Sequence, residues 1–172
     1  MFLIMERVIN LGNLELKESV ICTNRVVKVV EGGRTFSFST IAVVGNENGV
    51  VGYGFGKSAN VNDSITKAVS NAKKNLIRVP LNKESIYHEV VGRYNGNVVI
   101  LRPAAPGAGI KCGGTLKTVC EYVGIKNVLS KCIRRGSHCN CVRAAFDALY
   151  QMKDPISIAK SRHIPLNKVF NG

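Results

Sequence analysis

The stretch "GYGFGKS", residues 52–58, contains residue types that bind phosphate. Alternating glycines lead to Gly56-Lys57, and a polar stretch typical of a helix start follows. In the phosphate-binding loop of nucleotide hydrolases, four residues separate the first glycine from the Gly-Lys pair, so that successive backbone N–H groups surround one phosphate. That count requires a glycine at position 51, which is Val51. The spacing therefore argues against a nucleotide hydrolase.

The same glycines fit two other uses. A glycine-rich strand end lets a nucleic-acid backbone approach the peptide N–H groups, with Lys57 standing just before a helix N-terminus. Gly52 and Gly54 fit equally well in a twisted strand that packs closely under a helix. The sequence leaves both interpretations open.

Two further motifs match catalytic or metal sites only in part. The Pro- and Gly-rich segment 103–114 resembles a small-molecule kinase loop, but it lacks the paired serines, and acidic residues occur singly downstream. The segment "HCNC", residues 138–141, would need Cys132 and His163 to complete a zinc site. We therefore predict no catalytic residues, no metal and no cofactor.

The composition favours a polyanionic partner. Of 172 residues, 24 are Lys or Arg and 11 are Asp or Glu, which gives a formal net charge of +13. Such an excess of positive charge is typical of proteins that bind nucleic acids. We expect no membrane segment, because the apolar start at residues 1–5 is too short. The six cysteines lie in apolar or helical patterns, which favours reduced thiols in the cytoplasm.

The hydrophobic pattern predicts an α+β protein of two small domains. Residues 20–82 read as three strands, separated by turns at 32–33 and 48–49, and one helix that Pro80 ends. The apolar stripe of this helix is Ile65, Ala68, Val69, Ala72 and Leu76. Its other face is basic, with Lys67, Lys74 and Arg78 in one stripe and Lys73 beside it. Such a stripe is commonly a solvated face, and the alternative is that Lys67, Lys73 and Lys74 bind RNA.

Residues 83–154 read as the second domain. Two strands flank the hairpin signal Asn95-Gly96, and a helix, a strand and another helix follow. The apolar positions of the two helices are Leu116, Val119, Cys120 and Val123, then Val142, Ala145, Phe146 and Leu149. We expect an N-terminal arm at residues 1–19 and a partly ordered basic tail at residues 155–172.

Two long segments resemble the bacterial type of the small-subunit ribosomal protein five family. They are "RVVKVVEGGRTFSFSTIAVVGNENGVVGYGFGKSANVNDSITKAVSNAKKNLI" and "PAAPGAGIKCGGTLKTVCEYVGIKNVLSKC". The resemblance covers about residues 16–155 in unbroken order. It implies a first domain with the fold of double-stranded-RNA-binding modules, which read shape and phosphates, and a second α+β domain of the family's own type.

The resemblance also implies a function without catalysis. The chain would be a structural constituent of the small ribosomal subunit that binds 16S-type rRNA, next to small-subunit proteins four and eight and near the path by which mRNA enters. It would support subunit assembly and translational accuracy in the cytoplasm. The alternative from another class is a free-standing regulator that binds double-stranded RNA through the same sheet and helix.

The resemblance assigns candidate residues by position. The turn between the first two strands corresponds to a family loop that reaches the rRNA near the spectinomycin site. The candidate RNA-binding residues of this hairpin and of the glycine–lysine motif are Arg25, Lys28, Gly32, Gly33, Arg34, Gly54, Gly56 and Lys57. Candidate contacts to protein four are Gly107, Gly109 and Lys117.

The chain departs from the family pattern at two places. Glu31 stands where the family commonly has lysine, which weakens one phosphate contact. Arg134 and Arg135 stand at a Gly-Ser position, while Arg143 still matches. We count these three arginines among the candidate RNA-binding residues.

Overall fold

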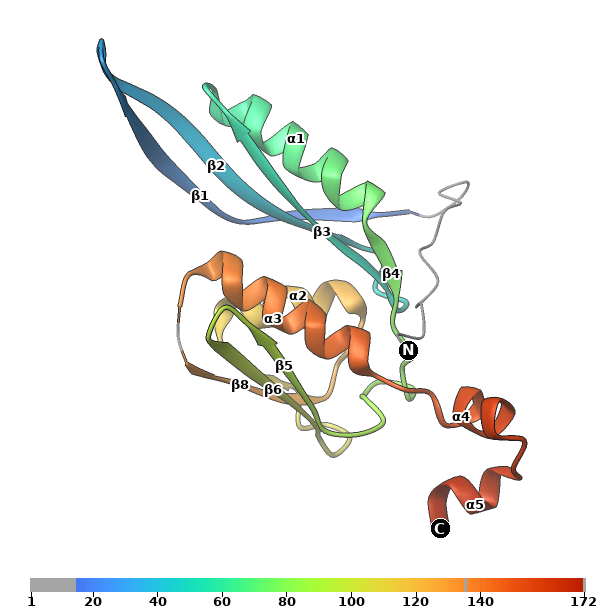
Figure 1. Ribbon diagram of the computed structural model, residues 1–172. Helices are drawn as coiled ribbons and strands as arrows, with labels where there is room; N and C mark the ends of the chain where they lie inside the picture. Colours follow the sequence, from blue (N-terminus) through green and yellow to red (C-terminus); the bar gives the residue numbers. More distant parts are fainter. Residues whose placement is uncertain (1–14, 135, 172) are drawn as a thin grey trace.

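The first domain is an antiparallel sheet with one helix on it. The computed structural model describes residues 15–134 and 136–171. The strands are β1 (Lys17–Val30), β2 (Gly33–Gly45), β3 (Val50–Ser58) and β4 (Leu76–Arg78), hydrogen-bonded in that order. Helix α1 (Val61–Lys74) packs on one face of the sheet (Figure 1). The predicted hairpin at Asn48-Gly49 is confirmed, because β2 and β3 are antiparallel neighbours around it.

Helix α1 lies against β3 because β3 has almost no side chains on that face. A Cβ at Gly52, Gly54 or Gly56 would lie 2.0–2.5 Å from a backbone oxygen of α1. Real Cβ atoms do not approach that closely, so only glycine allows this contact. On the neighbouring strand, the buried Thr40 hydroxyl lies 2.8 Å from that of Ser64 and joins β2 to the start of α1.

The second domain is a four-stranded sheet covered on one face by two helices. Its strands are β5 (Val90–Tyr94), β6 (Asn97–Pro103), β7 (Ile110–Lys111) and β8 (Val128–Arg134), in the order β5-β6-β8-β7. Helices α2 (Gly114–Val123) and α3 (His138–Gln151) have the predicted apolar positions buried. The Asn95-Gly96 turn has positive φ at both residues, +42° and +80°, as the hairpin prediction requires.

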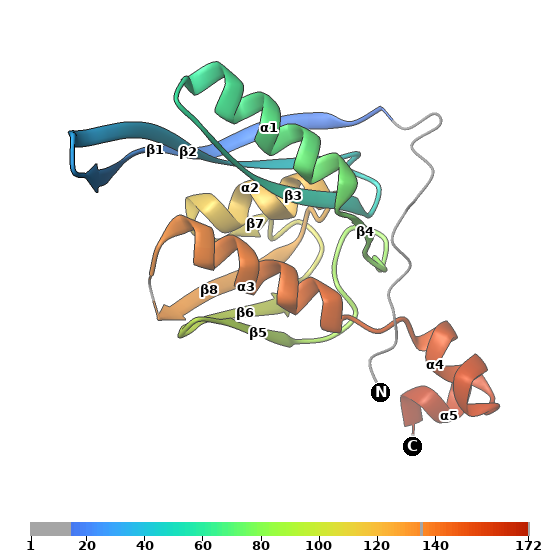
Figure 2. The same cartoon turned by 45° about the horizontal axis from the view of Figure 1, so that its top comes forward.

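The two domains share one hydrophobic core. From one side to the other, the layers are α1, the first sheet, α2 with α3, and the second sheet (Figure 1; Figure 2). Val43 and Val51 of the first sheet belong to the same buried cluster as Leu116 of α2. The ring centroids of Tyr53 and Phe146 lie 4.5 Å apart across this layer. The two α+β units are confirmed, but they pack as one body.

Three boundaries differ from the sequence-based expectation. Helix α1 ends at Lys74, well before Pro80, and Leu76 and Arg78 lie in β4. Residues 17–19 of the expected arm belong to β1, and residues 1–14 lie outside the described residues. The tail contains two helices, α4 (Pro155–Arg162) and α5 (Leu166–Asn171). Helix α4 begins there because the Asp154 carboxylate accepts a hydrogen bond from the Ile156 N–H at 3.3 Å, with Pro155 at the first helical position.

Candidate nucleic-acid interface

The outer part of the β1–β2 hairpin projects beyond the rest of the molecule (Figure 1; Figure 2). We call residues 25–37 the outer hairpin, because the pairing of β3 with β2 stops at Phe38. Val29 is 76% exposed at its end, and Val27 is 48% exposed. Three basic residues and one acidic residue lie in this segment. The outer hairpin thus offers cations and apolar side chains to a partner.

The cations of the outer hairpin lie on both of its faces. One face carries Arg25, Val27, Val29, Arg34 and Phe36, as the strand register shows. Lys28 lies on the other face. The Arg25 guanidinium lies 3.9 Å from the centroid of the Phe36 ring, a cation–π contact that holds this side chain flat on the hairpin. Lys28 and Arg34 are exposed.

The turn of the outer hairpin depends on Gly33. Its φ of +122° is accessible to glycine but rarely to residues with a side chain. Gly32 has no such φ, and a Cβ there would meet nothing within 4 Å. The turn is therefore open to a partner on the Gly32 side.

Gly54 and Gly56 do not form the open strand end that a nucleic-acid backbone could approach. Both are buried under α1, so they cannot let a phosphate approach the strand, and the packing interpretation of these glycines holds. Lys57 is exposed and pairs with Ser39. Because successive side chains of a strand alternate and Gly56 faces α1, Lys57 lies on the opposite face of the sheet. The N-terminus of α1 and the Lys57 side chain thus lie on opposite faces of the first sheet.

The basic face of α1 is partly neutralised. Lys67 and Lys74 are exposed, and the Lys67 ammonium lies 3.5 Å from the Ser58 hydroxyl. The Lys73 ammonium lies 2.6 Å from the Glu18 carboxylate of β1. Lys67 and Lys74 therefore remain the better candidates on this helix.

The arginines near the start of α3 differ in their surroundings. Arg134 is exposed at the end of β8, and Arg135 lies outside the described residues. Arg143 is half-buried, and its Nη1 donates a hydrogen bond to the Tyr94 hydroxyl at 2.5 Å. Its guanidinium also lies 5.9 Å from the centroid of the Phe55 ring. Arg143 joins the two domains, and it has less freedom to reach a phosphate.

The glycine-rich loop before α2 is held by a residue that the sequence did not reveal. Gly107 and Gly109 have φ of +84° and +72°, and their N–H groups both donate to the Asn127 side-chain oxygen at 3.1 Å. Asn127 is buried, and no motif marked it. Lys117 of α2 is exposed, 3.8 Å from Glu121. The loop and Lys117 thus lie at the surface with fixed geometry.

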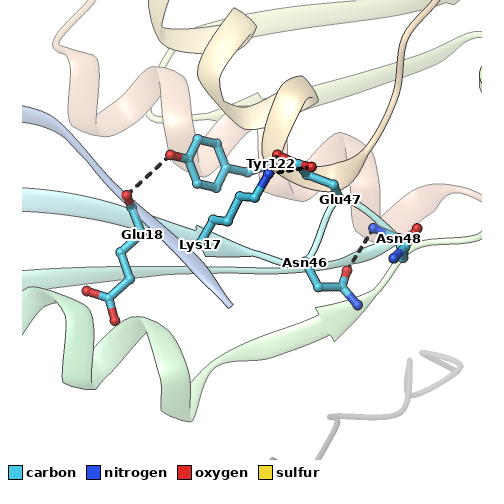
Figure 3. Close-up of polar contacts among 6 residues, drawn as sticks. All are labelled: Lys17, Glu18, Asn46, Glu47, Asn48 and Tyr122. Carbon is cyan, nitrogen blue, oxygen red and sulfur yellow. Dashed lines mark hydrogen bonds and ion pairs between the residues drawn. The ribbon is translucent and has the colours of Figure 1, made fainter. Parts of the chain in front are cut away.

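The turn at residues 46–49, which we call the inner turn, docks on the end of α2 (Figure 3). The Glu47 N–H donates to the Tyr122 carbonyl at 3.2 Å, and the Gly49 N–H donates to the Val123 carbonyl at 2.8 Å. The Tyr122 hydroxyl donates to the Glu18 carbonyl at 3.2 Å. The marks that these contacts between the domains left in the sequence include Gly45 and Gly124, where a Cβ would lie 2.1 Å and 1.9 Å from a backbone oxygen of the other domain.

The cysteine and histidine residues show no metal-binding arrangement. Within residues 15–134 and 136–171, no group of three or more His, Cys, Asp or Glu side chains could hold a metal ion. The Nδ1 of His138 lies 2.8 Å from the Thr115 hydroxyl. Burial raises the pKa of the Cys141 thiol to about 12, so this thiol stays protonated at neutral pH. In the same ranges, none of the helices combines the length and the apolar character needed to cross a bilayer.

Comparison with known proteins gives one consistent family. Residues 16–80 match the family described as "Ribosomal protein S5, N-terminal domain", and residues 92–162 match "Ribosomal protein S5, C-terminal domain". A Flavobacterium psychrophilum protein is 49% identical over 161 residues, which are 94% of this chain and 92% of that protein. A Porphyromonas gingivalis protein is 45% identical over the full length of both chains. Both are named "Small ribosomal subunit protein uS5".

Proposed function

Because the chain belongs to the ribosomal protein S5 family, we propose that it is a structural constituent of the small ribosomal subunit that binds 16S-type rRNA. The observation that assigns this function to particular residues is the outer hairpin, which projects from the body (Figure 1). It carries exposed cations on both faces. Family membership argues against an enzyme and does not favour a free-standing RNA-binding regulator. The chain acts in the cytoplasmic ribosome.

The outer hairpin binds rRNA through phosphates and through packing. Lys28 and Arg34 are exposed and lie on opposite faces, so the hairpin contacts two strands of RNA backbone or both sides of a groove. The exposed Val29 and Phe36 pack against sugars and bases. Lys57, Lys67 and Lys74 add phosphate contacts on the body of the first domain.

The second domain contacts neighbouring ribosomal proteins. The loop around Gly107 and Gly109 is exposed at Gly107 and is fixed by Asn127, as a protein interface requires. This loop and Lys117 of α2 contact small-subunit protein four, and protein eight lies nearby. The location near the path by which mRNA enters connects the chain with subunit assembly and translational accuracy.

Replacing two cations of the outer hairpin tests the proposal. In the double variant Lys28→Ala with Arg34→Ala, we expect weaker binding to small-subunit rRNA. The slope of log K against log[salt] is negative, and each lost phosphate contact reduces its magnitude by about one, so the magnitude should fall by about two in the double variant. Binding isotherms at several salt concentrations give this slope.

The matched control removes the same charge far from the outer hairpin. Lys153 and Lys160 are exposed at the end of α3 and in α4. The double variant Lys153→Ala with Lys160→Ala should keep most of the wild-type slope. If the hairpin variant and the control have equal slopes, the assignment of the outer hairpin to rRNA is wrong.

A further inference from the structure

A cavity of about 400 Å³ lies between the starts of α2 and α3. Its walls include the first residues of α2, the middle of β8 and the first residue of α3, namely Gly113, Gly114, Thr115, Ser130, Cys132 and His138. The contact of 2.8 Å between the Thr115 hydroxyl and the His138 Nδ1 joins the two helix starts at its rim. None of the described residues that line the cavity is among the candidate RNA-binding or protein-contacting residues.

The start of α2 presents free backbone donors to this cavity. The first hydrogen bond of the helix runs from the Lys117 N–H to the Gly113 carbonyl at 2.8 Å. The N–H groups of residues 114–116 therefore have no acceptor within the helix. The residue before the helix is Gly113, and no side chain of the described residues caps these groups. A helix start of this kind attracts an anion, because N–H groups and the helix dipole act together.

The two glycines at this helix start have no packing role. A Cβ at Gly113 or at Gly114 would meet nothing within 4 Å, and neither residue has a positive φ. This contrasts with Gly54, which helix α1 covers closely. Side chains would fit sterically at both positions, so no packing contact requires glycine there. The absence of side chains at both positions leaves the donors accessible from the cavity.

A buried hydroxyl group on the opposite wall points to a ligand independently of the helix. Ser130 is only 9% exposed, and among the described residues its Oγ has no hydrogen-bond partner. A buried polar atom without a partner is costly and rare in native proteins. Since Ser130 lines the cavity, a bound group can supply the missing acceptor.

The lining of the cavity carries no group that would repel an anion. None of the described residues that form its walls is Asp or Glu. The thiol of Cys141, which also lines it, stays neutral because burial raises its pKa to about 12. The positive end of α2 and the cationic Lys131, which also lines the cavity, therefore both favour an anion there.

We propose that this cavity binds one phosphate group, which accepts hydrogen bonds from the N–H groups of residues 114–116 and from the Ser130 hydroxyl. His138 stands at the rim and adds a third type of donor. The phosphate belongs either to a free ion or small phosphomonoester, or to the backbone of an RNA chain. This proposal does not depend on the outer hairpin as the main rRNA contact.

Titration of the full-length chain with inorganic phosphate at constant ionic strength tests the site. We expect saturable shifts of the backbone amide resonances of residues 114–116 in ¹H–¹⁵N spectra. Ser130→Ala should weaken binding by about 10-fold or more, as expected for one hydrogen bond to a charged acceptor. Gly114→Ala should also weaken it, while the thermal midpoint stays equal or rises, because alanine favours a helix over glycine.

The matched control is Ser161→Ala, which also removes a serine hydroxyl but lies in α4, outside the lining of the cavity. Its phosphate affinity should equal that of the wild type. Shifts that do not saturate, or that are the same in wild type, Ser130→Ala and Gly114→Ala, would overturn the proposal.

A second titration identifies the source of the phosphate. An RNA oligonucleotide without terminal phosphate is added to the phosphate-saturated protein, and the same amides are followed. Displacement of inorganic phosphate shows that a phosphodiester of an RNA chain enters the cavity. Retention of phosphate shows that the cavity accepts the free ion or a phosphomonoester. Both outcomes require the saturable binding measured first.

Discussion

The two turns at opposite ends of β2 have opposite surroundings. The inner turn, residues 46–49, is hydrogen-bonded to the last turn of α2 and lies beside Gly124. The turn at Glu31-Gly32 in the outer hairpin has no such neighbour, and a Cβ at Gly32 would meet nothing within 4 Å. The strand β2 therefore leads to a contact between the two domains at one end and to a free surface at the other.

Because the two turns have different surroundings, we expect changes in the inner turn to affect stability and changes in the outer hairpin to affect binding. Contacts of the inner turn are internal to the chain, so changes there should lower the free energy of unfolding. Changes in the outer hairpin remove groups that contact only solvent or a partner, so they should alter affinity and leave stability nearly unchanged. The following predictions test this separation.

The largest expected effect is that of Gly124→Ala. Gly124 has a φ of +95°, and a Cβ there would lie 1.9 Å from the Glu47 carbonyl oxygen. Both the backbone conformation and the collision oppose a side chain, so we expect the free energy of unfolding to fall by at least about 3 kcal/mol. Gly32→Ala, the matched change in the outer hairpin, should alter it by less than about 0.5 kcal/mol. Chemical denaturation measures both changes. Equal losses in the free energy of unfolding would show that the two turns do not differ in their contribution to stability.

Tyr122→Phe should have an intermediate effect. It removes the hydrogen bond of 3.2 Å from the Tyr122 hydroxyl to the Glu18 carbonyl and leaves the ring in place. We expect a loss of about 1 kcal/mol in the free energy of unfolding, with rRNA affinity unchanged. Paired denaturation and rRNA-binding measurements check this. A variant that binds rRNA more weakly but unfolds like the wild type would place the Tyr122 hydroxyl at the RNA interface instead.

Glu47→Gln should have the smallest effect. The Lys17 ammonium lies 2.8 Å and 2.9 Å from the two Glu47 carboxylate oxygens, and both groups are largely exposed. We expect a smaller loss than in Tyr122→Phe, and the loss should shrink at high salt because exposed ion pairs are screened. Denaturation at low and high salt measures it.

The ion pair also predicts a pH dependence. The hydrogen bond and charge of Glu47 raise the pKa of Lys17 above its ordinary value of 10.5. Its stabilisation is therefore complete below that value and is lost as the pH rises through the raised pKa. The difference in stability between wild type and Glu47→Gln should disappear at strongly alkaline pH. A difference that persists there would exclude the ion pair as its cause.

The sequence predicted what depends on local pattern. The spacing of Val142, Phe146 and their neighbours identified the buried side of α3, and Asn95-Gly96 identified a hairpin. Both signals arise from residues within a few positions of each other, where helical or strand geometry fixes the outcome. The exposed cations of the outer hairpin followed from the family resemblance.

The sequence could not predict what depends on distant partners. Leu76 continued the helical spacing of α1, but β3 offered it an edge to pair with, and it lies in β4. The glycines at 54 and 56 fitted a phosphate site until the position of α1 was known. Asn127 binds a loop about 20 residues earlier in the chain, and no spacing rule connects the two. In each case the deciding contact joins separate elements, and local patterns carry no record of it.

Crosslinking from the two ends of the first sheet tests the central claim most directly. A photoreactive p-benzoylphenylalanine is placed at the exposed Val29 in the outer hairpin, or at the exposed Asn48 in the inner turn as the control, and each variant is assembled into small ribosomal subunits. The account predicts that the residue at position 29 forms crosslinks to the small-subunit rRNA, and that these are stronger than any from position 48. Assembled subunits with no rRNA crosslink from position 29 would contradict it.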